Sequence, residues 1–145
     1  MGQLCEIDMD GNASSIPKSR SFVTATLEAW HLDYLADRAV LLVSELATNA
    51  VLHARTPFRI SMILEDALTV EVSDQSEEIP RVEANRVDSE HGRGLRLVSQ
   101  FASDWGWRPD GDGKTVWFSL ELDPTGVNKH SPDNRTGLGV STPYG

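Results

Sequence analysis

The sequence predicts an α+β protein, a two-layer sandwich in which helices cover one face of a mostly antiparallel sheet. Two segments with apolar residues at helical spacing lie in the first half of the chain, and most segments with two-residue alternation follow them. The chain has 145 residues, which is enough for one domain with a core of its own. We expect that domain to cover residues 1–122.

The first two expected elements are a strand and a helix. Residues 4–10 alternate between apolar and acidic side chains, which is the period of a half-buried strand, and Gly11-Asn12 supplies a turn after it. A helix is expected next, with Ser15 as its cap and Pro17 in its first turn. The apolar side of this helix consists of Phe22, Val23, Thr26, Leu27 and Trp30.

The segment over residues 33–54 predicts the longest helix of the chain. Its apolar residues follow one another in steps of three and four, which places them on one side of a helix. These residues are Leu35, Ala39, Leu42, Val43, Leu46 and Ala50. We expect this side to face the core.

Two strands joined by a tight turn are expected next. Apolar residues recur at every second position over residues 58–64 and again over 68–72, and Glu65-Asp66 lies between the two runs. This pattern predicts a β-hairpin with one face packed on an apolar core.

The remaining part of the domain begins with a long loop. From Gln75 to Glu90 the sequence has no periodicity and contains Pro80. A loop of this length inside a compact domain is usually functional. A helix over residues 94–101 and two closing strands over 105–108 and 115–122 complete the expected order.

Composition and charge exclude several classes of function. The net charge of −9 disfavours direct binding of nucleic acid or of an anionic membrane. Cys5 is the single cysteine, so neither a disulfide nor a thiolate zinc site is expected. No apolar run is long enough to span a bilayer and no export signal leads the chain, so we expect a cytoplasmic protein. Residues 123–145 are rich in Pro and Gly and predict a disordered tail.

The second helix carries the pattern with the most chemical content. Glu45, Asn49 and His53 are spaced four residues apart, so they line up along one edge of a helix. Asn49 also lies seven residues after Leu42, which returns it toward the core side, where a polar group needs partners. Two interpretations remain open on this pattern alone: a ligand site, or a packed helix with Asn49 bonded to backbone.

Two further signals are weak when taken singly. Asp74 ends the second strand of the hairpin, and Gly92 and Gly94 flank one residue at a helix start, where amides can bind phosphate. Either feature is also common in ordinary loops. Residues 111–115 (GDGKT) look like the end of a phosphate-binding P-loop, but Arg108 stands where that motif needs its first glycine, so we exclude one.

Taken together, these motifs resemble those of the GHKL (Bergerat-fold) ATPase superfamily, and within it the small anti-sigma-factor serine kinases. The resemblance covers roughly residues 16–122. Residues 45–54 (ELATNAVLHA) resemble the N box, and 70–74 (VEVSD) the strand that ends in the adenine-binding aspartate. Residues 92–98 (GRGLRLV) resemble the glycine box of the ATP lid, and 113–118 (GKTVWF) the closing strand.

The resemblance implies a role for each matching residue. Glu45 is the implied general base, Asn49 the implied ligand of Mg²⁺, and Asp74 the implied acceptor for the adenine amino group. The other implied nucleotide contacts are Ile79, Gly92, Arg93, Gly94, Leu95 and Thr115. The implied cofactors are ATP and Mg²⁺. The implied partners are a sigma factor and a serine-bearing anti-anti-sigma (STAS-type) protein, and a homodimer is common among such proteins.

The chain departs from the family pattern at two places. The family aspartate is normally followed by glycines, as in D-x-G-x-G, and this chain has Ser76 and Glu78 in the glycine positions. The closing strand has Lys114 where a threonine normally follows the glycine, with Thr115 one position later. A second hypothesis therefore stands beside the kinase: a non-catalytic protein-binding regulator with weak or lost nucleotide binding.

The negative charge is concentrated in one part of the sequence. Residues 65–90 hold nine acids and two bases, whereas the tail from Asp123 holds equal numbers of each. We therefore expect an acidic lid beside the nucleotide pocket, available either to close on a metal-bound nucleotide or to meet a basic protein surface.

Overall fold

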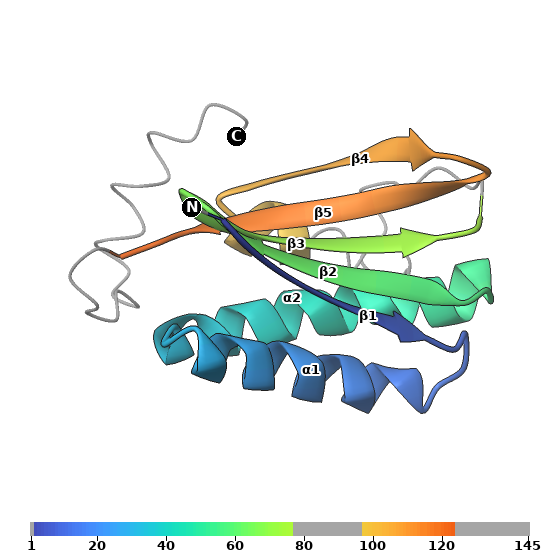
Figure 1. The fold of residues 1–145 in the computed structure, drawn as a ribbon. Helices are drawn as coiled ribbons and strands as arrows, with labels where there is room; N and C mark the ends of the chain where they lie inside the picture. Colours follow the sequence, from blue (N-terminus) through green and yellow to red (C-terminus); the bar gives the residue numbers. More distant parts are fainter. Residues whose placement is uncertain (1, 77–96, 124–145) are drawn as a thin grey trace.

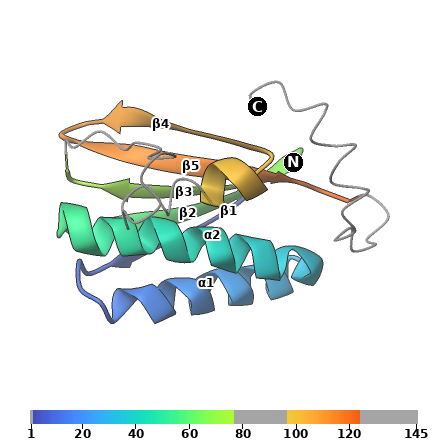
Figure 2. The same ribbon diagram turned by 180° about the vertical axis from the view of Figure 1, so that it is seen from behind.

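The computed structural model describes residues 2–76 and 97–123. These residues form two layers, a five-stranded sheet and a layer of helices that covers one of its faces (Figure 1 and Figure 2). The predicted α+β sandwich is confirmed. The predicted domain limits, the tail and the inner part of the long loop lie wholly or partly outside the described residues and stay predictions.

The sheet contains β1 (Gln3–Met9), β2 (Phe58–Leu64), β3 (Ala67–Asp74), β4 (Asp104–Asp110) and β5 (Gly113–Glu121). Its spatial order is β1-β2-β3-β5-β4, and all four pairings are antiparallel. The helical segment over residues 97–101 belongs to the connection between β3 and β4. The central pairing between β3 and β5 therefore joins two strands that are far apart in the sequence.

The helical layer is formed mainly by α1 (Ser15–Ala29) and α2 (Ala36–Asn49). A 3-10 turn, Asp33–Leu35, leads into α2, and a π-helical turn, Ala50–Ala54, continues it. The predicted helix over residues 33–54 is therefore confirmed as one continuous helical stretch, with three different hydrogen-bond patterns along it.

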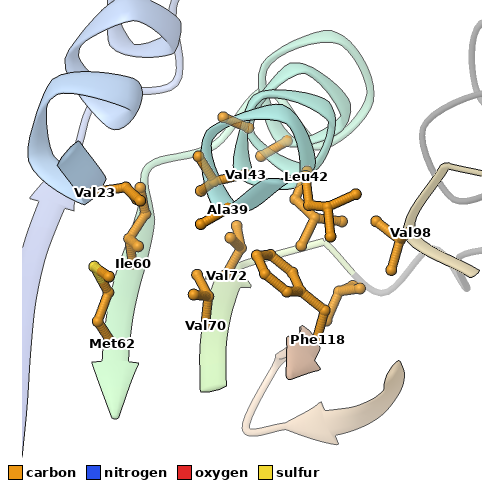
Figure 3. Close-up of a cluster of buried hydrophobic side chains, with 14 of the residues drawn as sticks. Val23, Ala39, Leu42, Val43, Ile60, Met62, Val70, Val72, Val98 and Phe118 are labelled. Atoms are coloured by element: carbon orange, nitrogen blue, oxygen red, sulfur yellow. The ribbon is translucent and has the colours of Figure 1, made fainter. Parts of the chain in front are cut away.

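The core lies between α2 and the covered face of the sheet. Because successive side chains on a strand point to opposite faces, every second residue of β2, β3 and β5 enters this layer. Figure 3 shows these side chains meeting Ala39, Leu42 and Val43 of α2. The strand residues labelled there are Ile60, Met62, Val70, Val72 and Phe118, and all are buried.

The start of α1 differs from the sequence prediction. Ser15 is the first helical residue and not the cap, and its hydroxyl donates a hydrogen bond to the Asp10 carbonyl oxygen at 2.6 Å. The side chain of Asn12 accepts hydrogen bonds from the backbone and hydroxyl of Ser14. The turn after β1 is thus held by side-chain bonds that satisfy polar groups ahead of the helix.

The last strand is fixed at its end by a single tyrosine. The Tyr34 hydroxyl accepts a hydrogen bond from the Asp123 backbone N–H at 2.8 Å, just after β5. Figure 1 shows that the end of β5 and the start of β1 lie at one end of the sheet, and the tip of β3 lies at the other.

Within residues 2–76 and 97–123, no helix combines the length and apolar composition needed to cross a membrane.

Truncation of Leu42 is expected to destabilise the fold. Leu42 is fully buried between α2 and the sheet, so Leu42→Ala removes buried apolar contacts and leaves a cavity that costs about 2–5 kcal/mol. The matched control is Leu41→Ala, the next residue of α2, whose side chain is 39% exposed and should cost less than about 1 kcal/mol. Urea unfolding measures both values. Equal losses for the two variants would contradict the described orientation of α2.

Candidate functional site

The Glu45 and Asn49 side chains lie one helical turn apart on α2, and both are half-buried. Asn49 is seven residues after Leu42, so the two share one side of the helix. In Figure 3 Leu42 points toward Val98, whereas Val23 of α1 lies on the other side of α2. Glu45 and Asn49 are therefore on the side of α2 that faces away from α1.

The helix ends directly after Asn49 in a wide π turn. The Arg55 backbone N–H donates to the Ala50 carbonyl oxygen at 2.8 Å, and Arg55 has a left-handed conformation with φ of 57°. A π turn contains more residues than an α turn. His53 lies inside this turn, and the expectation that it continues the line of Glu45 and Asn49 stays a prediction.

Asp74 ends β3 on the covered face of the sheet. It shares that face with Val70 and Val72 and is only 9% exposed. Beyond it, the Gln75 backbone N–H donates to the Thr56 hydroxyl at 3.1 Å, which ties the end of β3 to the segment after α2. Figure 1 and Figure 2 both show the end of β3 and the C-terminal end of α2 at the same end of the molecule.

The carboxylate of Asp74 forms a buried ion pair with Lys114. The Lys114 ammonium lies 3.1 Å from each of the two carboxylate oxygens, and the side chains are 11% and 6% exposed for Lys114 and Asp74. The two residues are directly opposite each other in the β3–β5 pairing. Gly113 permits this approach, because a Cβ there would collide with the Asp74 carbonyl oxygen.

Lys114 was missing from the residues predicted for the site, although the sequence contained a signal for it. Lys114 has the same parity as Val116 and Phe118 on β5, and those apolar residues must face the core. Alternation alone therefore places the Lys114 side chain on the covered face. Its partner could not be found in this way, because Asp74 belongs to a strand 40 residues earlier.

Thr115 has the opposite parity and lies on the other face of the sheet. It is fully buried there, and its hydroxyl donates to Asp110 at 2.8 Å and lies 2.7 Å from the Ser73 hydroxyl. Since a hydroxyl has one proton to donate, Ser73 is the donor in the second bond. The placement of Thr115 among the nucleotide contacts is therefore corrected: Lys114, and not Thr115, shares the face of Asp74.

A family model confirms what the motifs and fold suggest. The model described as histidine kinase-like ATPase domain matches residues 10–120. The chain belongs to the histidine kinase-like ATPase family. This membership agrees with the motif resemblance of the N box, of the strand that ends in Asp74 and of the closing strand.

A solved structure supports the same fold. The RsbU and RsbW domains of Rv1364c from Mycobacterium tuberculosis match with a TM-score of 0.62 over 83% of this chain, at 15% sequence identity. The match spans 32% of the length of that chain. A comparison with curated proteins found no match. At such low identity the structural likeness establishes the fold of the ATPase domain and nothing further.

Several expected nucleotide contacts lie outside the described residues of the ATPase domain. These contacts are Ile79, Gly92, Arg93, Gly94 and Leu95, and their roles stay predictions. Ser76, in the first position where the family has glycine, is described. Its backbone N–H donates to the Asp74 carboxylate at 2.9 Å. Among the described non-glycine residues only His31 and Arg55 have positive φ, so Ser76 adopts no conformation that would require glycine.

A polar cleft of about 580 Å³ lies near the ends of β1, β2 and β3, lined mostly by residues of the uncovered face of the sheet together with Asp74. Acidic residues dominate its lining, which also includes Arg59. The acids are Glu6, Asp8, Asp10, Glu71, Asp74 and Asp110. Apart from Asp74, which faces the helices, none of these acids belongs to the residues predicted to hold the nucleotide.

One exposed ion pair crosses this outer face. Arg59 Nε lies 2.7 Å from Asp8 Oδ1, and the hydrogen bond from Arg59 lowers the pKa of Asp8 below its ordinary value. The same bond raises the pKa of Arg59. Because the Asp8 pKa is lowered in the folded state, its stabilising effect is present above the unfolded pKa and is lost as the pH falls through the folded pKa. Both side chains are mostly exposed, so solvent screening keeps this effect small.

The buried and exposed ion pairs should respond very differently to removal of the cation. Lys114→Met leaves the Asp74 carboxylate buried without its cation, which is expected to cost about 3–5 kcal/mol of unfolding free energy. The double variant Asp74→Asn, Lys114→Met should regain a large part of that loss. Arg59→Met is the matched control and should cause little change. Urea unfolding of the wild type and the three variants measures these differences in unfolding free energy. A Lys114→Met variant as stable as the wild type would contradict the buried pairing.

Proposed function

We propose that the chain is a cytoplasmic ATP-dependent serine kinase of the anti-sigma-factor type. It transfers the γ-phosphate of ATP to a serine of an anti-anti-sigma (STAS-type) partner and also sequesters a sigma factor. The observation that carries this proposal is the Glu45/Asn49 pair on α2, at the end of the molecule where β3 ends in Asp74, in a histidine kinase-like ATPase domain.

The residues present suit Mg²⁺ bound together with a nucleotide. The amide oxygen of Asn49 is a hard ligand of the kind that Mg²⁺ prefers, and phosphate oxygens usually supply further ligands. In the part of the chain that the structure describes, no group of three His, Cys, Asp or Glu residues could hold a metal by itself. The proposed site therefore depends on Asn49 and on the triphosphate together. Bound there, Mg²⁺ would neutralise charge on the phosphates.

Glu45 is the proposed general base. It lies one turn before Asn49, so a carboxylate and the proposed metal ligand occupy adjacent positions along one edge of α2. In the transfer, Glu45 accepts the proton of the incoming serine hydroxyl as that oxygen forms its bond to the γ-phosphorus. The bond between the γ-phosphorus and the bridging oxygen breaks, and ADP leaves.

Asp74 is the proposed acceptor for the adenine amino group. Its position at the end of β3 on the covered face supports this role, since the base then lies on the same face of the sheet as α2. The proposed protein partners rest on the motif resemblance to anti-sigma-factor kinases. The fold likeness to a structure that contains an RsbW domain is consistent with them.

A second function is favoured by one specific observation. Both carboxylate oxygens of Asp74 already bind the Lys114 ammonium, and a base must share or displace that contact. If it cannot, the domain is a non-catalytic regulator that binds its protein partner with nucleotide weakly held or absent.

Calorimetric titration of Mg-ATP into the full chain separates the two functions. The wild type is expected to bind, and Asn49→Ala should weaken binding at least about tenfold, because changes to the residues that support a metal's ligands already cost about 10–100-fold. Thr48→Ala is the matched control: among the described residues its hydroxyl donates to the Ser44 carbonyl oxygen within the helix, and the affinity of this variant for Mg-ATP should stay unchanged.

Transfer itself is tested with labelled γ-phosphate and a STAS-type substrate protein. Glu45→Ala should retain Mg-ATP binding while losing transfer by a factor of about 100 or more. If the wild type gives no heat of binding at millimolar Mg-ATP, the kinase proposal is contradicted and the non-catalytic binding regulator is favoured. Binding without transfer to any serine of the substrate protein also contradicts the kinase.

A further inference from the structure

We propose that Lys114 determines base specificity by sharing the base edge with Asp74. The two side chains act as one donor–acceptor unit, in which the carboxylate accepts from the base and the ammonium donates to it. This inference rests on the proposed nucleotide function and goes beyond it, because it predicts that the pocket accepts purines with either an amino or a keto group at C6.

The hydrogen bonds of Asp74 and Lys114 leave one acceptor position and one donor proton for the base. Asp74 Oδ1 accepts from the Ser76 backbone N–H at 2.9 Å and from Lys114 at 3.1 Å, which uses both of its lone pairs. Asp74 Oδ2 accepts only from Lys114 within the described residues, so one acceptor position remains. An ammonium has three protons, and the two contacts with Asp74 engage at most two of those on Lys114.

The strand pairing holds this unit in place. Asp74 and Lys114 face each other across β3 and β5, and both project from the face that α2 covers. Gly113 lets β5 approach the Asp74 backbone closely. The strand pairing therefore holds the Lys114 ammonium beside the Asp74 carboxylate. An exposed lysine on the surface would contact an acidic side chain only part of the time.

The hydrogen-bonding groups on the edge of a purine determine how well it fits beside Asp74 and Lys114. A carboxylate alone accepts from the amino group of adenine and repels a keto oxygen, because both are acceptors. An adjacent ammonium offsets that repulsion and can donate to the keto oxygen, or to a ring nitrogen of adenine. A pocket that contains Asp74 and Lys114 should therefore discriminate weakly between these two kinds of purine.

Nucleotide titrations with the full chain test this inference. Calorimetry with the magnesium complexes of ATP and ITP should give wild-type affinities within about tenfold of each other. Lys114→Thr should raise the preference for ATP to about 100-fold or more, chiefly through loss of ITP binding, since a hydrogen bond to a charged group is removed. Lys114→Arg retains the positive charge and should keep the ratio within about threefold of the wild type.

Arg108→Met is the matched control for the loss of one positive charge. Arg108 lies on the neighbouring strand β4 and pairs with Glu71 on the uncovered face, so its removal should leave the ATP to ITP ratio unchanged. Circular dichroism shows whether each variant is folded. The wild-type measurement needs no variant, so the inference stays testable even if Lys114→Thr unfolds.

Each remaining outcome has one meaning. If the wild type binds ATP but rejects ITP by about 100-fold or more, the inference is overturned and the proposed function stands. If Lys114→Thr tightens both nucleotides with an unchanged ratio, Lys114 only obstructs the base, and the inference is again overturned. If the wild type binds neither nucleotide, the proposed function falls together with the inference.

Discussion

The pairing of β3 with β5 is the constraint on which the rest of the structure depends. It joins two strands separated by the whole connection from Gln75 to Asp112, and its register extends from Ala67 opposite Glu121 to Asp74 opposite Lys114. A shift of one residue would turn every side chain of β5 to the other face. Core formation and the chemistry at the end of the sheet are therefore decided by the same set of backbone hydrogen bonds.

The two faces of the sheet have opposite chemical character. The covered face is mainly apolar along its length, and at one end it carries the buried pair of Asp74 and Lys114. The uncovered face has rows of acidic, hydroxyl and basic side chains across the strands, such as Asp8, Arg59 and Ser73. Part of the negative charge of this chain therefore lies on an open sheet face, as a two-layer fold permits, and not only in the segment that resembles the lid.

Periodicity predicted most of the fold because each strand and helix has a clear apolar side. The hairpin, the long second helix and the closing strands follow directly from residues such as Val70, Leu42 and Phe118. Periodicity could not predict the Asp74–Lys114 pair, since the partner of a strand residue depends on a register set by tertiary packing. The π turn after Asn49 was missed for a similar reason, because no residue type specifies it.

The hydrogen bond between Tyr34 and Asp123 has a consequence for where a group can be attached to the described part of the chain. It anchors the chain at the end of the sheet where β1 also begins, opposite the end that carries Asp74 (Figure 1). Gly2 and Asp123, the first and last residues that the structure describes, therefore lie at the end of the sheet opposite Asp74. A covalent attachment made at either residue would be placed at the end of the sheet away from the Asp74–Lys114 pair.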